Sequence, residues 1–206
     1  NGTSPYKIVL PEILESKEEF AAQELQDVFY QSTGVTLPII LETEAMKDFS
    51  KHYISIGDTV FRKMANLSVD EFNQAGFKLK REQNTLIIAG KTSYASLYGV
   101  YEFLERNLGY RWYASDEVYV DNVYNAKLLD FDYSYQPPVG ETSIEHIVKN
   151  INGVSDRAKT NNWAIALGWP HSFNYTVDPA TYPQYYKSGN TTTLCLTDVG
   201  MLEVAY

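Results

Sequence analysis

Two stretches of the chain carry the hydrophobic periodicity of amphipathic helices. The apolar residues of the first stretch share one helical face: Ala21, Leu25, Val28 and Phe29. Those of the second stretch do the same: Leu97, Val100, Tyr101, Leu104 and Leu108. Gly34 and Gly109 follow the two stripes, at positions where helices end in a left-handed residue. We therefore predict two long helices, the first of which begins at a capping box formed by Ser16 and Glu19.

Short apolar runs predict strands around these helices. The predicted strands cover residues 7–10, 37–41, 53–57, 77–81 and 86–89, and a short helix is predicted at 59–65. The polar residues 82–84 make the last two strands a hairpin, and the continuous run 86–89 is expected to be buried on both faces. Paired strands between helices indicate an α+β fold, with a mixed sheet and helices packed on it, rather than a regular parallel repeat.

The character of the chain changes after Gly109. Residues 110–113 and 118–120 are aromatic and extended, and residues 128–135 alternate between apolar and polar. Gln136-Pro137-Pro138 is the best boundary, because consecutive prolines stiffen a linker and exclude helix. We therefore divide the chain into a first α/β domain, residues 1–136, and an incomplete second domain, residues 137–206.

The second domain holds fewer predicted elements. They are a helix at 144–151, an extended stretch at 163–169, a helix opened by Asp178 and Pro179, and a strand at 194–196. About 70 residues with two strands cannot close a barrel or a large sheet. The chain also starts at Asn1 without an initiator Met, so we expect a trimmed chain that is cut short at Tyr206.

Charge and hydropathy restrict the class of partner. The net charge is −9, and the chain shows no Lys/Arg stripe of the kind that binds a phosphate backbone, which excludes nucleic acid. No apolar run approaches the ~18 residues that a membrane span requires. The single cysteine, Cys195, cannot form an internal disulfide, which fits a reducing compartment or an exported bacterial protein built without disulfides.

Motifs for nucleotide, metal or nucleophilic chemistry are incomplete. Residues 90–92 read Gly-Lys-Thr, the tail of a phosphate-binding loop, but Thr85 stands where the first glycine of that loop is required. Three histidines have no partner at metal-ligand spacing: His52, His146 and His171. The GxSxG motif of hydrolases is absent. We therefore expect neither a metal nor a cofactor.

Three pairs of neighbouring acids are possible glycosidase carboxylates, which lie about 5–10 Å apart across a sugar site. They are Asp116 with Glu117, Asp130 with Asp132, and Glu141 with Glu145. An acidic chain offers such pairs by chance, so we assign no catalytic residue. A small complete glycoside hydrolase that depends on Glu141 or Asp132 is kept as an alternative.

Aromatic residues are abundant, with 17 Tyr and 3 Trp. Trp163, Trp169 and His171 lie close together in a polar stretch, and stacking rings beside hydrogen-bonding groups are what a sugar subsite requires. These three residues are our candidates for a carbohydrate-facing rim. The alternative is an interface or core patch exposed by truncation.

Several segments in order resemble the accessory domain that precedes the catalytic barrel in family 67 α-glucuronidases and family 20 β-hexosaminidases. They are residues 20–26, 33–34 with 37–39, 54–59, 76–79 with 86–92, and 97–105 with 108–113. The resemblance spans residues 6–120 and has one departure, because Tyr94-Ala95 stands where the family usually carries Arg-Gly. Residues 171–173, 182–186 and 194–198 resemble the region that follows this domain in a bacterial family of glycan-utilisation proteins.

The resemblance implies a mixed-sheet domain like domain 2 of β-hexosaminidase, related in shape to zinc peptidases but lacking their metal. It implies that residues 137–206 begin a (β/α) barrel, and that any catalytic carboxylates lie beyond Tyr206. We expect a non-catalytic accessory domain of an exported, periplasmic or cell-surface bacterial protein that acts on oligosaccharides or polysaccharides. Arg111, Trp112 and Tyr113 are the candidates for the face that docks on the barrel. A stand-alone glycan-binding module is the alternative.

Overall fold

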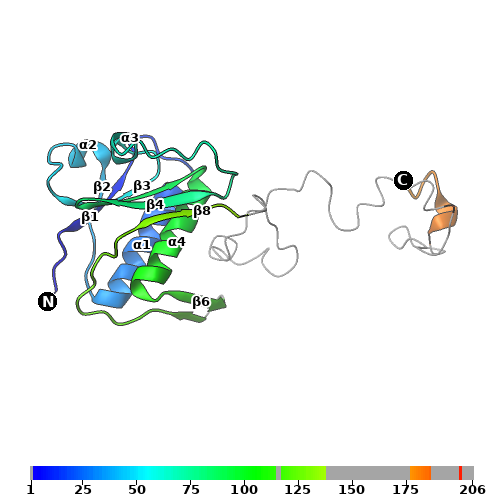
Figure 1. The fold of residues 1–206 in the computed structure, drawn as a ribbon. Helices are drawn as coiled ribbons and strands as arrows, with labels where there is room; N and C mark the ends of the chain where they lie inside the picture. The colour runs from blue at the N-terminus through cyan, green and yellow to red at the C-terminus, as the bar shows by residue number, and fades with distance from the viewer. Residues whose placement is uncertain (1, 115–116, 138–176, 187–199, 201–206) are drawn as a thin grey trace. The chain divides into compact units, whose positions relative to one another are not determined.

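A computed structural model describes residues 2–114, 117–137, 177–186 and 200 of the chain. The chain divides into two compact units, Asn1–Trp163 and Ala164–Tyr206. The first unit is an α+β domain with a mixed sheet (Figure 1). This confirms the predicted fold class, whereas the predicted division after residue 136 stays a prediction.

The domain consists of β1 (Tyr6–Leu10), α1 (Glu18–Thr33), β2 (Ile39–Leu41), α2 (Glu42–Ala45), β3 (His52–Ile56), α3 (Val60–Met64), β4 (Phe77–Glu82), β5 (Thr85–Gly90), α4 (Ser93–Leu108), β6 (Arg111–Ala114), β7 (Glu117–Tyr119) and β8 (Asp132–Tyr135). Six strands form one sheet in the order β2-β1-β3-β5-β4-β8, and β6 pairs with β7 in a separate hairpin. Strands β2, β1, β3 and β5 are parallel, while β4 and β8 are antiparallel to their neighbours. The sheet is therefore mixed because the β4–β5 hairpin adds an antiparallel edge to a parallel core.

The sheet is covered on both faces, which explains the continuous apolar runs in its central strands. Helices α1 and α4 lie side by side under one face, and α2 and α3 lie over the other (Figure 1). In β5, Leu86 and Ile88 join the core beneath α1 and α4, whereas Ile87 and Ala89 join the smaller core of α2 and α3. The expectation that this strand is buried on both faces is confirmed.

The helix ends show which local signals the fold uses. Gly34 and Gly109 end α1 and α4 in the left-handed conformation, as predicted. The predicted capping box of α1 is wrong, because the helix begins after Lys17 and no side chain caps it. Ser16 instead places its hydroxyl 3.3 Å from that of Ser93, at the start of α4. The Ser16 hydroxyl therefore makes a tertiary contact instead of the predicted helix cap.

Two strands have other bounds than the sequence pattern predicts, and one short helix was not predicted. Strand β2 begins at Ile39, because Pro38 has no N–H for the ladder, although its carbonyl still accepts from the Ile8 N–H at 2.8 Å. The alternation over 128–135 yields only the short strand β8. Helix α2 was not predicted, since four residues are too few to show a helical period.

The described part of the second unit is a turn followed by the 3-10 helix η1 (Pro183–Tyr185). Asp178 does accept hydrogen bonds from the Ala180 N–H and the Thr181 hydroxyl, as a cap would. The α-helix predicted to start there is wrong, because Pro183 lacks an N–H and disfavours helical geometry at Tyr182 before it. The predicted elements at 144–151, 163–169 and 194–196 lie outside the described residues. No described helix is long and apolar enough to span a membrane.

Candidate functional site

The residues predicted to dock on a neighbouring domain lie on β6, in the two-stranded hairpin that follows α4. Trp112 is half-buried and packs against the main core. Its indole N–H is buried and has no acceptor among the residues that the structure describes. Trp112 therefore fixes the hairpin to the domain by apolar packing, and its docking role stays a prediction.

Arg111 and Tyr113 lie on the solvent side of this hairpin. Arg111 pairs directly with Tyr119 of β7, and directly opposed residues share one face of a two-stranded sheet. Tyr113 sits at the irregularity between Trp112 and Ala114, and 65% of its surface is exposed. Tyr119 is 54% exposed, and its hydroxyl donates to Asp121 at 2.9 Å. That hydrogen bond is the main cause of its raised pKa, and the electrostatic effect of Tyr113 adds to it.

The outer face of the hairpin consists of Arg111, Tyr113 and Tyr119. Sequence reasoning missed Tyr119, because only the strand register shows which tyrosines share a face with Arg111. The Arg111 guanidinium donates to the carbonyls of Tyr110 at 2.6 Å and Glu105 at 3.2 Å. A cation at these carbonyls also suits the negative end of α4, so Arg111 anchors the hairpin as well as exposing charge.

A second candidate site is the edge of the sheet where the parallel strands end, which is where α/β sheets usually bind ligands. Glu18 lies there at the first turn of α1 and is only 3% exposed. It accepts a hydrogen bond from the Glu15 N–H at 2.8 Å, and backbone hydrogen bonding from Asp58 also acts on it. Glu18 thus ties the loop after β1 to the loop after β3.

Burial raises the pKa of the Glu18 carboxyl, because desolvation outweighs the hydrogen bonds that stabilise its charged form. Gly57, with φ of 85°, allows the carboxylate to approach this closely, since a Cβ at that position would overlap Oε1 of Glu18. A buried carboxyl with a raised pKa is a feature of many active sites. The hydrogen bonds of the Glu18 carboxylate come from backbone N–H groups of the two neighbouring loops, so its role is structural.

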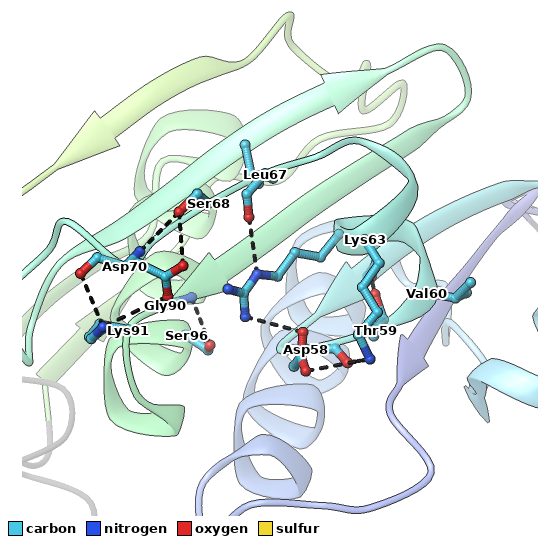
Figure 2. Close-up of polar contacts among 12 residues, drawn as sticks. Asp58, Thr59, Val60, Lys63, Leu67, Ser68, Asp70, Gly90, Lys91 and Ser96 are labelled. Carbon is cyan, nitrogen blue, oxygen red and sulfur yellow. Dashed lines mark hydrogen bonds and ion pairs between the residues drawn. The ribbon is translucent and has the colours of Figure 1, made fainter.

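Polar contacts also join the loop after β3 to α3 and to the turn that follows it (Figure 2). Asp58 pairs with Arg62 at 3.2 Å and with Lys63 at 3.5 Å, and Arg62 also donates to the Leu67 carbonyl at 3.1 Å. A shallow hollow lies between these residues, with Asp58 as its single carboxylate among the residues described. One paired carboxylate cannot supply the acid and base that glycoside hydrolysis requires.

The Gly-Lys-Thr turn after β5 uses its hydrogen-bond donors within the protein (Figure 2). The Gly90 N–H donates to the Ser96 hydroxyl at 3.0 Å, and the Lys91 ammonium lies 3.1 Å from the Asp70 carbonyl. Thr92 caps α4 by accepting from the Ala95 N–H. A Cβ on Gly90 would overlap the backbone of α4, so this glycine allows close strand–helix packing. The turn therefore serves packing and capping, not the binding of phosphate.

The acidic pairs that are candidate glycosidase carboxylates do not form a site in the described part of the chain. Asp130 and Asp132 are both exposed, and Asp132 lies opposite Lys80 in the β4–β8 ladder. Asp116, Glu141 and Glu145 lie outside the described residues. Within the part that the structure covers, no three His, Cys, Asp or Glu side chains gather as a metal site.

The profile of the family described as "Glycosyl hydrolase family 67 N-terminus" matches residues 4–103, slightly less than half of the chain. Residues 4–103 are similar to this family. The matched residues run from β1 into α4, and the resemblance to α-glucuronidase accessory domains is confirmed. Hairpin β6–β7 and strand β8 follow the matched residues.

Two solved structures share about half of the chain with low similarity. One is a family 138 glycoside hydrolase targeting pectin rhamnogalacturonan II, with 12% identity, a TM-score of 0.35, and 49% of this chain and 10% of that one covered. The other is a family 115 4-O-methyl-α-glucuronidase with specificity for decorated arabinogalactans, with 15% identity, a TM-score of 0.33, and 48% and 13% covered. The chain therefore spans about a tenth of these proteins. No curated protein matches the sequence.

The predicted carbohydrate-facing residues Trp163, Trp169 and His171 lie outside the described residues, so their role stays a prediction. His146 and Cys195 also lie outside them. His52 begins β3, and its ring packs edge-on against Tyr6 with centroids 5.1 Å apart. This contact gives His52 a packing role beside the first strand.

Proposed function

We propose that residues 1–136 are a non-catalytic accessory domain that packs beside a (β/α)-type catalytic barrel. The parent would be a bacterial protein that is exported to the periplasm or cell surface and degrades complex glycans. In this proposal the domain has the shape of β-hexosaminidase domain 2, like a zinc peptidase without its metal, and residues 137–206 begin the barrel. The family 67 match supports a role related to glycoside hydrolases.

The non-catalytic assignment rests on the acidic side chains at the carboxyl edge of the sheet, which are engaged in hydrogen bonds and ion pairs within the domain. Glu18 is buried against backbone amides, and Asp58 is paired with Arg62. Glu42 accepts from the Val60 N–H at 2.6 Å and thereby holds the start of α3. Side chains committed to loop amides and cations are poor general acids or bases, so the chemistry is assigned to a neighbouring domain.

Activity measurements test this assignment directly. We expect the purified chain not to hydrolyse aryl glycosides, including aryl α-glucuronides, while the full-length gene product does. Turnover by the chain alone that is lost in Glu141→Gln or Asp132→Asn would establish the rival view of a small complete hydrolase. Sequencing the gene downstream of the Tyr206 codon is the companion test, and an open frame of several hundred residues is expected.

The outer face of the β6–β7 hairpin is the proposed docking surface. It presents two exposed tyrosines and a guanidinium on a hairpin held by Trp112. The double variant Arg111→Ala, Tyr113→Ala in the full-length protein should lower its thermal midpoint and speed proteolytic release of the domain. The matched control is Tyr30→Ala on α1, which removes a tyrosine that is 55% exposed. Equal effects of the double variant and the control would contradict docking through this face.

A further inference from the structure

At the other end of the sheet from Glu18, the C-terminal halves of α1 and α4 enclose a cavity of ≈ 150 Å³. Phe29, Ile54 and Phe103 are among its apolar lining residues, and Tyr6 and Tyr124 are among its aromatic ones. Its lining is mixed polar and apolar, and a space of about 150 Å³ is large enough for a ring of the size of benzene. The space therefore suits one six-membered ring, entering from the solvent side where Tyr124 is 98% exposed.

A second hollow of ≈ 340 Å³ adjoins the first, because Thr33 and Tyr124 line both. Tyr30, Gln31 and Asn122 are among its other lining residues. Tyr124 thus borders both spaces, and its exposed aromatic ring can stack on the C–H face of a sugar. The pair of hollows fits two linked rings better than an isolated one.

The two hollows are uncharged in the described residues that line them. This is unusual for the chain, in which 21% of residues are charged and the net charge is −9. Amide groups take the place of charges, and those of Asn107 and Asn125 line the first hollow, whereas the Thr33 hydroxyl is already bonded to the Phe29 carbonyl and the Val35 N–H. Amides both donate and accept, which matches the hydroxyls of a neutral sugar. A carboxylated sugar would need a cation that these hollows lack in the part of the chain described.

The loop that carries Tyr124 is fastened at both ends. The Ser32 hydroxyl donates to the Asp121 carbonyl at 2.6 Å, and the Val123 N–H donates to the Ser32 carbonyl at 2.9 Å. After Tyr124, the Leu129 N–H donates to the Asn107 side chain at 3.0 Å, and Arg81 donates to the Leu128 carbonyl at 3.0 Å. Because these bonds already fix the loop backbone, a ligand that binds at Tyr124 has to order only its side chain.

We infer that these two hollows bind two adjacent rings of a neutral oligosaccharide, with Tyr124 stacked between them and Asn125 hydrogen-bonded to a sugar hydroxyl. This site is separate from the β6–β7 docking face, and it involves none of the predicted residues Trp163, Trp169 and His171. It gives the domain its own contact with the glycan while the catalytic step stays elsewhere. The inference does not depend on whether the domain docks on a barrel.

The test is an NMR titration of the 206-residue chain with the neutral disaccharides cellobiose, xylobiose, maltose and lactose. A glucuronic-acid disaccharide serves as the charged comparison. We expect saturable shifts at Thr33, Tyr124 and Asn125 with at least one neutral probe, and weaker binding of the charged one. Tyr124→Ala and Asn125→Ala should each weaken binding about tenfold, whereas Tyr124→Phe should retain most of it.

The matched control is Tyr113→Ala, which removes an exposed tyrosine from the hairpin and should leave the affinity unchanged. Thermal unfolding of each variant checks the fold, and little change is expected because Tyr124 is exposed. No saturation with any neutral probe overturns the inference, as does stronger binding of the charged probe. Binding that is unchanged in both Tyr124→Ala and Asn125→Ala overturns the location. These outcomes leave the docking proposal intact, since it is tested through Arg111 and Tyr113.

Discussion

Single residues at the carboxyl edge of the sheet carry tertiary contacts that their neighbours in sequence do not reveal. Glu18 begins a helix whose first turn is acidic, so its local position suggests an ordinary exposed residue near a helix start. The fold instead buries its carboxyl against the left-handed Gly57. The two residues form one contact, and each limits what the other position can hold.

Gly57→Ala should lower the free energy of unfolding by about 3 kcal/mol, because the added Cβ overlaps the Glu18 carboxylate and φ is positive. Gly34→Ala is the matched control, since Gly34 also has a positive φ but has open space around it. It should cost only about 1 kcal/mol of backbone strain. Urea denaturation measures both, and equal losses would contradict the close approach of Glu18 to Gly57.

Glu18 should also give the domain a defined pH dependence. Because burial raises its pKa, the folded state binds the Glu18 proton more tightly than the unfolded chain. Its stabilising contribution is complete below the ordinary pKa of a glutamate and is lost as the pH rises through the folded value. Relative to Glu18→Gln, the native protein should lose unfolding free energy between about pH 4 and about pH 8. Urea denaturation of both proteins at the two pH values measures this, and a difference that is constant with pH would refute it.

At the scale of elements, the two long helices share the same periodicity but start in different ways. Thr92 caps α4 with its side chain, whereas α1 begins at Lys17 without a side-chain cap. Thr92→Ala should therefore cost about 1 kcal/mol of unfolding free energy. Ser16→Ala should cost less than about 0.5 kcal/mol, because Ser16 faces Ser93 and does not cap α1. Thermal or urea unfolding compares them, and an equal loss in the two variants would restore the capping box that the sequence suggests.

At the scale of the whole domain, the last strand closes the sheet from a distance in sequence. Strand β8 pairs with β4, Phe131 before it is buried, and the Asn73 amide donates to the Pro137 carbonyl at 2.6 Å. A chain that ends at Pro137 should unfold cooperatively, and its urea midpoint should equal that of the 206-residue chain. A chain that ends at Lys127 should lose at least about 3 kcal/mol, because it removes Phe131 and uncovers β4. Equal stability of the two shortened chains would contradict the closing role of β8.

Much of the fold follows from local pattern. The sequence predicts the apolar stripes of α1 and α4, the glycines that end these helices and the polar turn of the β4–β5 hairpin. Each of these signals lies within a short segment of the chain. The short helix α2 and the true lengths of β2 and β8 were not readable. Their bounds depend on which neighbouring strand supplies hydrogen bonds, and that is decided by pairing across the sheet.

The sequence alone determined the class of fold, since it rests on the order and periodicity of the elements along the chain. The resemblance of residues 4–103 to family 67 N-terminal domains rests on sequence segments in the same order. Only the tertiary structure decided which side chains meet. It placed Tyr119 beside Arg111, enclosed Glu18 against Gly57, and gathered uncharged residues from α1, α4 and the Tyr124 loop around two hollows. Such sites join segments that lie tens of residues apart, and no local pattern encodes the register and packing that bring them together.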